Sequence, residues 1–193
     1  MTQAALGVPK FSRIVLLGFM GAGKSTAGPL LSSRLGWSFL DADDVLVQRT
    51  GRSIEELFNQ HGESGFRELE AATVAHLLQQ HKTVIALGGG AIESAGTRDL
   101  LAQLNDTCTV FLEAQFQTMI DRCDRSSAVR PLLKDRAGLA ERYERRLPHY
   151  RKATITVPTD GLTPEAIVES LLRLLAEPDE ETEIAGKPTR PIP

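Results

Sequence analysis

Residues 18–26 read Gly18-Phe19-Met20-Gly21-Ala22-Gly23-Lys24-Ser25-Thr26, and the apolar run Ile14-Val15-Leu16-Leu17 stands directly before them. The pattern G-x-x-x-x-G-K-[ST], placed between a buried strand and the start of a helix, is typical of phosphate-binding loops. Its glycines let the backbone approach phosphate oxygens closely, and the N–H groups at the helix start favour an anion. A plain glycine-rich turn is the alternative, but strand, spacing and the Lys-Ser pair agree and indicate nucleoside triphosphate binding.

The loop also predicts how a nucleotide is held. We expect phosphate contacts along the loop and the first helical turn, from Gly21, Ala22, Gly23, Lys24, Ser25 and Thr26. Lys24 supplies a mobile positive charge for the β- and γ-phosphates, and the Ser25 hydroxyl is suited to ligate Mg²⁺.

The composition suits one α/β domain without a general affinity for nucleic acid. The chain has 193 residues, with 22 basic and 25 acidic side chains and a net charge of −3. One segment is nevertheless basic, with Arg122, Arg125, Arg130, Lys134, Arg136, Arg142, Arg145, Arg146, Arg151 and Lys152. Beside a phosphate loop, such a cluster favours a bound polyanion over DNA, although we expect most of its members to be surface charges paired with acidic neighbours.

Cysteine usage and the termini indicate a reduced, cytoplasmic setting. Cys108 and Cys123 form no C-x-x-C pair, so neither a disulfide framework nor a zinc-bearing lid is predicted, and Cys108 is expected in the core. Residues 1–10 lack the features of a signal peptide, and no apolar run is long enough to span a bilayer. We therefore expect no membrane partner.

Strand and helix patterns alternate, which predicts an α/β fold of three layers, with a five-stranded parallel sheet covered by helices. The expected strands are residues 13–17, 38–40, 83–87, 108–112 and 154–157. The expected helices are residues 24–35, 62–80, 114–123, 139–151 and 164–176.

Composition also divides the chain into three parts. Residues 1–10 form an N-terminal extension, residues 11–176 the folded domain, and residues 177–193 an acidic, proline-rich tail that we expect to be disordered. Within the domain, residues 124–138 are polar, rich in arginine and interrupted by Pro131. In a phosphotransferase such a segment is expected to be a mobile lid.

Three carboxylates, Asp41, Asp43 and Asp44, follow the predicted strand 38–40. Ligands bind at the carboxyl ends of parallel strands, and alternation along an extended backbone would place Asp41 and Asp43 on the same side. One could support Mg²⁺, and the other could accept a hydrogen bond from a substrate hydroxyl. A helix N-cap with acidic first-turn residues is the alternative, and we expect it to account for Asp44.

Further candidates are a glycine triplet and three arginines. Gly88-Gly89-Gly90 follows the predicted strand 83–87, where missing side chains permit close approach of the backbone to a ligand; a flexible turn is the alternative. Arg67, Arg130 and Arg146 could each be surface residues. A guanidinium is also the group that binds a carboxylate or phosphate through two hydrogen bonds.

Taken in order, seven blocks of sequence resemble the shikimate kinase family. They are Gly18–Thr26, Leu40-Asp41-Ala42-Asp43, Arg49-Thr50-Gly51-Arg52-Ser53-Ile54, Gly65-Phe66-Arg67-Glu68-Leu69-Glu70, Leu87-Gly88-Gly89-Gly90-Ala91, Arg130-Pro131-Leu132-Leu133 and Arg146-Leu147-Pro148-His149-Tyr150. The resemblance covers residues 11–176, and the glycine triplet with the Gly-Phe-Arg block distinguishes this family from other small P-loop kinases. It implies a P-loop NTPase fold of the nucleoside monophosphate kinase type, a short arginine-bearing lid and a monomeric protein.

The resemblance implies ATP-dependent phosphorylation of the 3-hydroxyl of shikimate, giving shikimate 3-phosphate and ADP in the route to chorismate and aromatic amino acids. ATP would be the co-substrate and one Mg²⁺ per subunit the cofactor. Lys24 would bridge the phosphates, while Ser25 and Asp41 would hold Mg²⁺. Arg130 would close over the γ-phosphate from the lid.

The resemblance also implies an acceptor site. Asp43 would hydrogen-bond the shikimate hydroxyls and orient the nucleophile. Arg67 and Arg146 would clamp the carboxylate, with Glu70 holding Arg67 in position. The other acceptor-site residues implied are the backbone of Gly88, Gly89 and Gly90 and the apolar walls Phe58 and Phe66.

The chain departs from the family at the adenine contact. An adjacent arginine pair is common there, whereas this chain reads Asp121-Arg122-Cys123-Asp124-Arg125. Arg122 is the candidate to stack on adenine, and Arg125 is the alternative.

Three alternative functions remain open. The first is another acceptor, as in a gluconate-kinase-like or nucleotide kinase, against which Arg67 and Arg146 beside Asp43 favour a carboxylated polyol. The second is a sensor that binds a nucleotide or a metabolite without turnover. Loss of Lys24 or Asp43 would favour a sensor, and both residues are present. The third is a nucleotide-driven switch, for which no guanine-reading segment is recognisable.

Overall fold

The computed structural model describes residues 11–125 and 136–176. The strands are β1 (Arg13–Leu17), β2 (Ser38–Asp41), β3 (Thr83–Ala86), β4 (Thr107–Glu113) and β5 (Ile155–Pro158). The helices are α1 (Lys24–Leu35), α2 (Ala42–Thr50), α3 (Ile54–Leu77), the 3₁₀ helix η1 (Ala91–Glu93), α4 (Ala95–Gln103), α5 (Phe116–Arg125), α6 (Arg136–Tyr150) and α7 (Pro164–Ala176). The N-terminal extension, the tail, most of the predicted lid and Arg130 lie outside the described residues.

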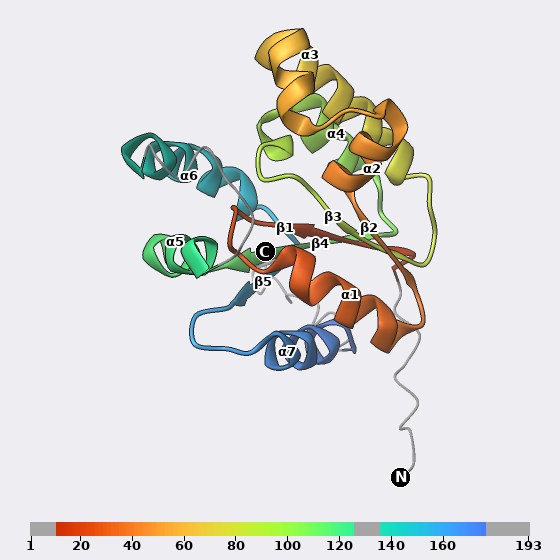
Figure 1. The fold of residues 1–193 in the computed structure, drawn as a ribbon. Coiled ribbons are helices and arrows are strands. Elements are labelled where there is room, and N and C mark those ends of the chain that lie inside the picture. The colour runs from red at the N-terminus through yellow and green to blue at the C-terminus, as the bar shows by residue number, and fades with distance from the viewer. Residues whose placement is uncertain (1–10, 126–135, 177–193) are drawn as a thin grey trace, which may run out of the picture.

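The strands form one parallel sheet in the order β2-β3-β1-β4-β5. Figure 1 shows α1 and α7 side by side on one face of the sheet, with α2, α3 and α4 on the other, so the predicted three-layer fold is confirmed. The three central strands are buried along almost their whole length, as apolar parallel strands covered on both faces should be. In the described part of the chain, no helix is both long and apolar enough to cross a lipid bilayer.

The order of the strands creates a crevice at their carboxyl ends. The connection after β1 runs through α1 to the edge strand β2, whereas the connection after β3 passes back over β1 to reach β4. Adjacent strands whose connections leave in opposite directions open a gap in which ligands of α/β proteins bind. The phosphate loop follows β1, the glycine triplet follows β3 and Asp41 ends β2, so all three predicted motifs meet at this edge.

Helical structure around the acceptor motifs differs from the sequence-based expectation. Helix α3 begins at Ile54, eight residues before the predicted start at Gly62, with Ser53 and Glu56 forming a reciprocal capping box. Gly62 has φ 65° and ψ −175°, which breaks α3 into two segments. Helices α2 and α4 were not predicted, because each buries only two side chains and so shows little apolar periodicity.

Candidate active site

The loop between β1 and α1 has a backbone that only glycine adopts readily. Gly18, Gly21 and Gly23 have φ of 146°, 74° and 99°. Helix α1 begins after Gly23, and among the described residues no side chain caps its N-terminus with a hydrogen bond. The first turn of this helix lines a cleft. The unsatisfied N–H groups and positive end of a helix favour an anion, so the geometry suits a phosphate group.

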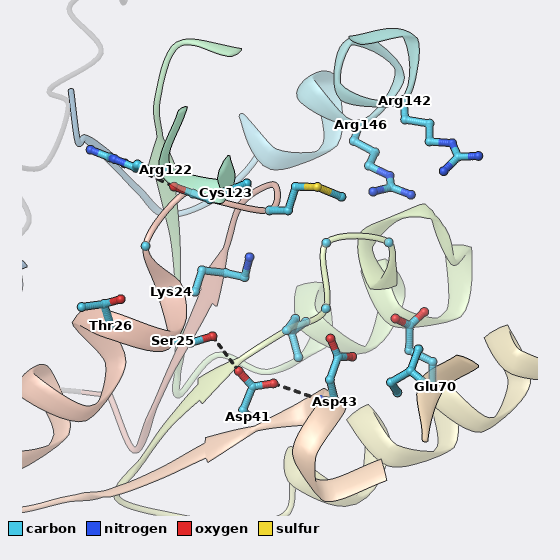
Figure 2. A pocket seen from close by; sticks show the side chains of 18 of the residues that line it. Lys24, Ser25, Thr26, Asp41, Asp43, Glu70, Arg122, Cys123, Arg142 and Arg146 are labelled. Atoms are coloured by element: carbon cyan, nitrogen blue, oxygen red, sulfur yellow. Dashed lines mark hydrogen bonds between the residues drawn. The ribbon is translucent and has the colours of Figure 1, made fainter. Parts of the chain in front are cut away.

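One cleft of about 1380 Å³ contains most of the predicted site residues. Its lining includes Gly21, Gly23, Lys24, Ser25, Thr26, Asp41, Asp43, Phe58, Phe66, Arg67, Glu70, Gly88, Gly89, Gly90, Arg122 and Arg146. Figure 2 shows Lys24 between the loop and Asp43, with Arg146 approaching from α6. Ala22 is fully buried and is not among the residues that line this cleft.

The nucleotide end of the cleft brings Lys24, Ser25 and Asp41 together. The Lys24 ammonium donates hydrogen bonds to the carbonyls of Gly18 and Phe19, at 2.7 and 3.1 Å, which holds it over the loop. The Ser25 hydroxyl donates to Asp41 Oδ2 at 2.9 Å. A hydroxyl and a carboxylate so close together are hard oxygen ligands of the kind Mg²⁺ takes beside phosphates, so the residues fit this ion.

Asp41 and Asp43 both line the cleft, but the reason given from the sequence is wrong. The chain does not continue extended after β2; Asp41 is the N-cap of α2, and its Oδ1 accepts a hydrogen bond from the backbone N–H of Asp43 at 3.1 Å. Asp43 and Asp44 are acidic residues of the first turn of α2. The alternative interpretation, a capped helix start, was therefore right for Asp44. The helix turn directs Asp43 into the cleft, while Asp44 is exposed.

Asp43 and Glu70 lie side by side beneath the glycine triplet (Figure 2). A Cβ on Gly88 would stand 2.8 Å from Asp43 Oδ1 and 3.0 Å from Glu70 Oε1, so only glycine leaves room for both carboxylates. Burial, and then the Asp41 charge, raise the pKa of Asp43, against the opposing effect of Lys24. Burial also raises the pKa of Glu70, although Arg67 opposes it.

The two predicted clamping arginines meet around a carboxylate that the sequence did not indicate. Arg67 Nη1 donates to Glu70 Oε2 at 2.7 Å, and Arg67 Nη2 lies 3.9 Å from Glu93 Oε2. Arg146 donates from Nε to the same Glu93 oxygen at 2.8 Å. Arg145, the preceding residue, donates to Glu93 Oε1 at 2.9 Å.

Phe58 and Phe66 line the end of the cleft at which the resemblance implies an acceptor. The rings of Phe58 and Phe66 stack with centroids 4.0 Å apart across the break in α3. On the opposite side, the Tyr150 hydroxyl donates to the carbonyl of Gly89 at 2.5 Å, and this fixes the glycine turn to α6. Tyr150 stands in the block that carries Arg146, and its own role was not recognised from the sequence.

The far end of the cleft lies beyond the phosphate loop. Arg122 is held there by hydrogen bonds to the Thr159 hydroxyl at 3.0 Å and the Gly21 carbonyl at 3.3 Å. Apolar residues that sequence reasoning missed complete this end, namely Leu162, Pro164 and Ile167, together with the buried Cys123. Arg125 is exposed and is not among the described lining residues, so the geometry favours Arg122 as the arginine near a bound base.

Fold and cleft together define a small P-loop phosphotransferase with a cationic acceptor end. A model of the shikimate kinase family matches residues 20–176. The chain is 43% identical over 162 residues to a shikimate kinase of Streptomyces coelicolor, covering 82% of this chain and 92% of the relative. It is 39% identical over 173 residues to a shikimate kinase of Chlorobium chlorochromatii, covering 84% and 90%.

A solved structure of shikimate kinase from Acinetobacter baumannii in complex with shikimate is also similar. It superposes with a TM-score of 0.80 at 33% identity, covering 86% of this chain and 94% of the other. The chain belongs to the shikimate kinase family, and it is therefore a kinase. The fold expected from the resemblance is confirmed.

Proposed function

We propose that this enzyme transfers the γ-phosphoryl group of ATP to the 3-hydroxyl of shikimate, giving shikimate 3-phosphate and ADP. The observation that carries the proposal is that Lys24, Asp43 and Arg146 line one cleft. The cationic site at Lys24 suits the triphosphate of ATP. The carboxylate of Asp43 suits the hydroxyl of the acceptor, and the guanidinium of Arg146 suits its carboxylate. A cytoplasmic location, expected from cysteine usage and the N-terminus, and a monomeric state, implied by the resemblance to the family, stay predictions.

At the nucleotide end, Lys24 would bridge the β- and γ-phosphates while the loop from Gly21 to Thr26 binds them through its backbone. Mg²⁺, held by Ser25 and by Asp41, would neutralise charge on the β- and γ-oxygens when bound. Arg122 would stack on the adenine. Arg130, outside the described residues, would stabilise the γ-phosphate.

At the acceptor end, Arg67 and Arg146 would bind the carboxylate of shikimate, with the backbone of Gly89 beside the ring. Phe58 and Phe66 would cover its apolar side. Asp43 would accept a hydrogen bond from the 3-hydroxyl, orient its oxygen toward the γ-phosphorus and take its proton. The new bond joins that oxygen to phosphorus as the bond to the β–γ bridging oxygen breaks and ADP leaves.

The test measures ADP release by the purified protein with Mg-ATP and one acceptor at a time. Shikimate alone should give turnover, whereas gluconate, quinate and a nucleoside monophosphate should not. Turnover only with another acceptor would support the kinase activity but reject shikimate as the substrate. Tight nucleotide binding with no turnover on any acceptor would favour the sensor alternative. In a separate assay, chelation of Mg²⁺ should abolish the turnover with shikimate.

A further inference from the structure

Glu93 contacts arginines that line the cleft without being a lining residue itself, and neither a motif nor the proposed mechanism explains it. It ends the 3₁₀ helix η1, three residues after the glycine triplet, and its side chain is 22% exposed. Its carboxylate lies among three guanidinium groups, those of Arg67, Arg145 and Arg146. Arg98, on α4, donates to the carbonyls of Ile92 and Glu93 at 2.8 and 2.7 Å, so the backbone carrying this carboxylate is itself fixed.

Glu93 determines which edge of Arg146 faces the cleft. Arg146 directs both Nε and Nη2 to Glu93 Oε2, at 2.8 and 2.7 Å. Its third nitrogen, Nη1, lies toward the glycine turn, 3.7 Å from where a Cβ on Gly89 would stand. The Phe19 ring, with its centroid 5.5 Å from Arg146 Cζ, supports the guanidinium from the phosphate loop.

The negative charge of Glu93 also balances the buried positive charge of Arg146. The Arg146 side chain is only 10% exposed, and a buried cation without a partner carries a large desolvation cost. Burial by itself raises the pKa of Glu93, but hydrogen bonds from Arg145 and Arg146 outweigh that effect and lower it below the ordinary value. The Glu93 carboxylate is therefore ionised at neutral pH.

We propose that Glu93 is a positioning residue of the acceptor site, fixing the Arg146 guanidinium and its separation from Arg67 so that both are preorganised to bind a substrate carboxylate. The inference rests on the proposed function, because it assumes a carboxylated acceptor. Preorganisation lowers the entropy lost on binding, so the loss of Glu93 should weaken acceptor binding rather than the chemical step.

The test compares the steady-state kinetics of wild type, Glu93→Gln and Glu113→Gln in the whole enzyme. Glu93→Gln should raise the KM for shikimate about tenfold, the effect of one lost charged hydrogen bond, with KM for ATP and kcat within about twofold. Glu113→Gln is the matched control, since Glu113 pairs at 3.3 Å with Arg151, just after α6, away from the cleft. It should leave all three constants unchanged.

Two further results decide the role. Glu93→Asp, which keeps the charge on a shorter side chain, should give an intermediate KM for shikimate, and thermal unfolding checks that each variant is folded. An unchanged KM for shikimate in Glu93→Gln would reduce Glu93 to a tether between η1 and α6. A lower KM would mean that Glu93 competes with the substrate carboxylate, and either outcome overturns the proposal.

Failure of the proposed function would be visible separately in the wild type. If the wild type phosphorylates another carboxylated acceptor, the same KM comparison with that acceptor tests Glu93. If its acceptor carries no carboxylate, both ideas are overturned. If it turns over no acceptor, calorimetric titration with shikimate replaces KM, and equal affinity in wild type and Glu93→Gln overturns the positioning role.

Discussion

At the scale of single residues, the cleft keeps two carboxylates in surroundings that disfavour their charge. Asp43 and Glu70 both have raised pKa values, with burial as the largest cause. A carboxyl group whose pKa is higher in the folded state binds protons more readily when folded. Stability therefore falls as pH rises from the ordinary pKa to the raised one, and these carboxylates cost stability at neutral pH. Such a cost is expected at an acceptor site that needs a proton acceptor.

Asp43→Asn should therefore stabilise the protein while it removes activity. We expect kcat to fall by at least about 10²-fold, the usual contribution of a positioned base. The unfolding midpoint at pH 7 should rise, and the difference should shrink as pH approaches the ordinary value of 3.8. Asp44→Asn, in the same helical turn but exposed, is the control for charge at the α2 N-terminus and should keep its activity. A destabilised Asp43→Asn variant would contradict the burial argument.

Lys24→Ala tests the nucleotide end. The ammonium lies 2.7 Å from the Gly18 carbonyl, and we expect its loss to cost about 3 kcal/mol or more of transition-state stabilisation, a fall of about 10²-fold in turnover. ADP release at saturating shikimate measures it. Lys152→Ala, at an exposed position, is the control. Unchanged turnover in Lys24→Ala would reject the assignment of the phosphate loop.

The sequence predicted those site residues that motifs mark, and missed those that tertiary packing supplies. Lys24 and Ser25 follow from the spacing of the loop itself. Glu93, by contrast, meets Arg146 across 53 positions, and an acidic residue after a glycine turn carries no signal of that contact. Pro164 was predicted as the start of a helix. Its position at the cleft, however, depends on how α7 packs, which the sequence does not indicate.

At the scale of elements, predictability followed burial. Strand β1 was predicted without error and β4 within one residue at each end, because their apolar runs are continuous. The helices that were missed bury few side chains; α2 buries only Ala42 and Leu46. The first segment of α3 was missed although it is capped by Ser53, since Gly62 interrupts its periodicity.

The break at Gly62 lets the two segments of α3 bring Phe58 onto Phe66, and this gives a prediction. Its φ of 65° with ψ of −175° is a conformation that essentially only glycine adopts. Among the described residues, and apart from its two neighbours and the adjoining helix backbone, no heavy atom lies within 4 Å of a Cβ built there, so Gly62→Ala costs mainly backbone strain, about 1–3 kcal/mol of unfolding free energy. Denaturant unfolding measures the loss, and the KM for shikimate should rise as the aromatic pair shifts.

Gly96→Ala is the matched control, because Gly96 lies inside α4 and a Cβ there meets only Ser94 Oγ at an ordinary 3.7 Å. It should stabilise the protein by about 0.5–1 kcal/mol through higher helix propensity. Equal effects of the two substitutions would show that the Gly62 conformation does not constrain the fold.

At the scale of the whole molecule, the sheet would keep the two proposed substrates apart and bring their reacting ends together. The segments that follow β1, β2 and β3 all lie at the carboxyl edge of the sheet, so in the proposed reaction a nucleotide on the β1 loop would face an acceptor on the β3 loop across Asp43. Helix α6 contributes Arg146 to one end of the cleft, where its Tyr150 also binds the Gly89 carbonyl, whereas α5 contributes Arg122 to the other end. The two ends therefore depend on different helices, and their ligands can be separated by mutation.

Ligand-induced stabilisation should separate them directly. At 100 times its dissociation constant, a ligand stabilises the folded state by about 2.7 kcal/mol. In a protein of this size that raises the unfolding midpoint by roughly 5–10 °C. Arg146→Ala should keep the shift given by Mg-ADP and lose the one given by shikimate, since it removes a clamp on the acceptor alone, and Lys24→Ala should do the reverse. If either substitution removed both shifts equally, the cleft would act as one unit, and the assignment of Lys24 and Arg146 to different substrates would be wrong.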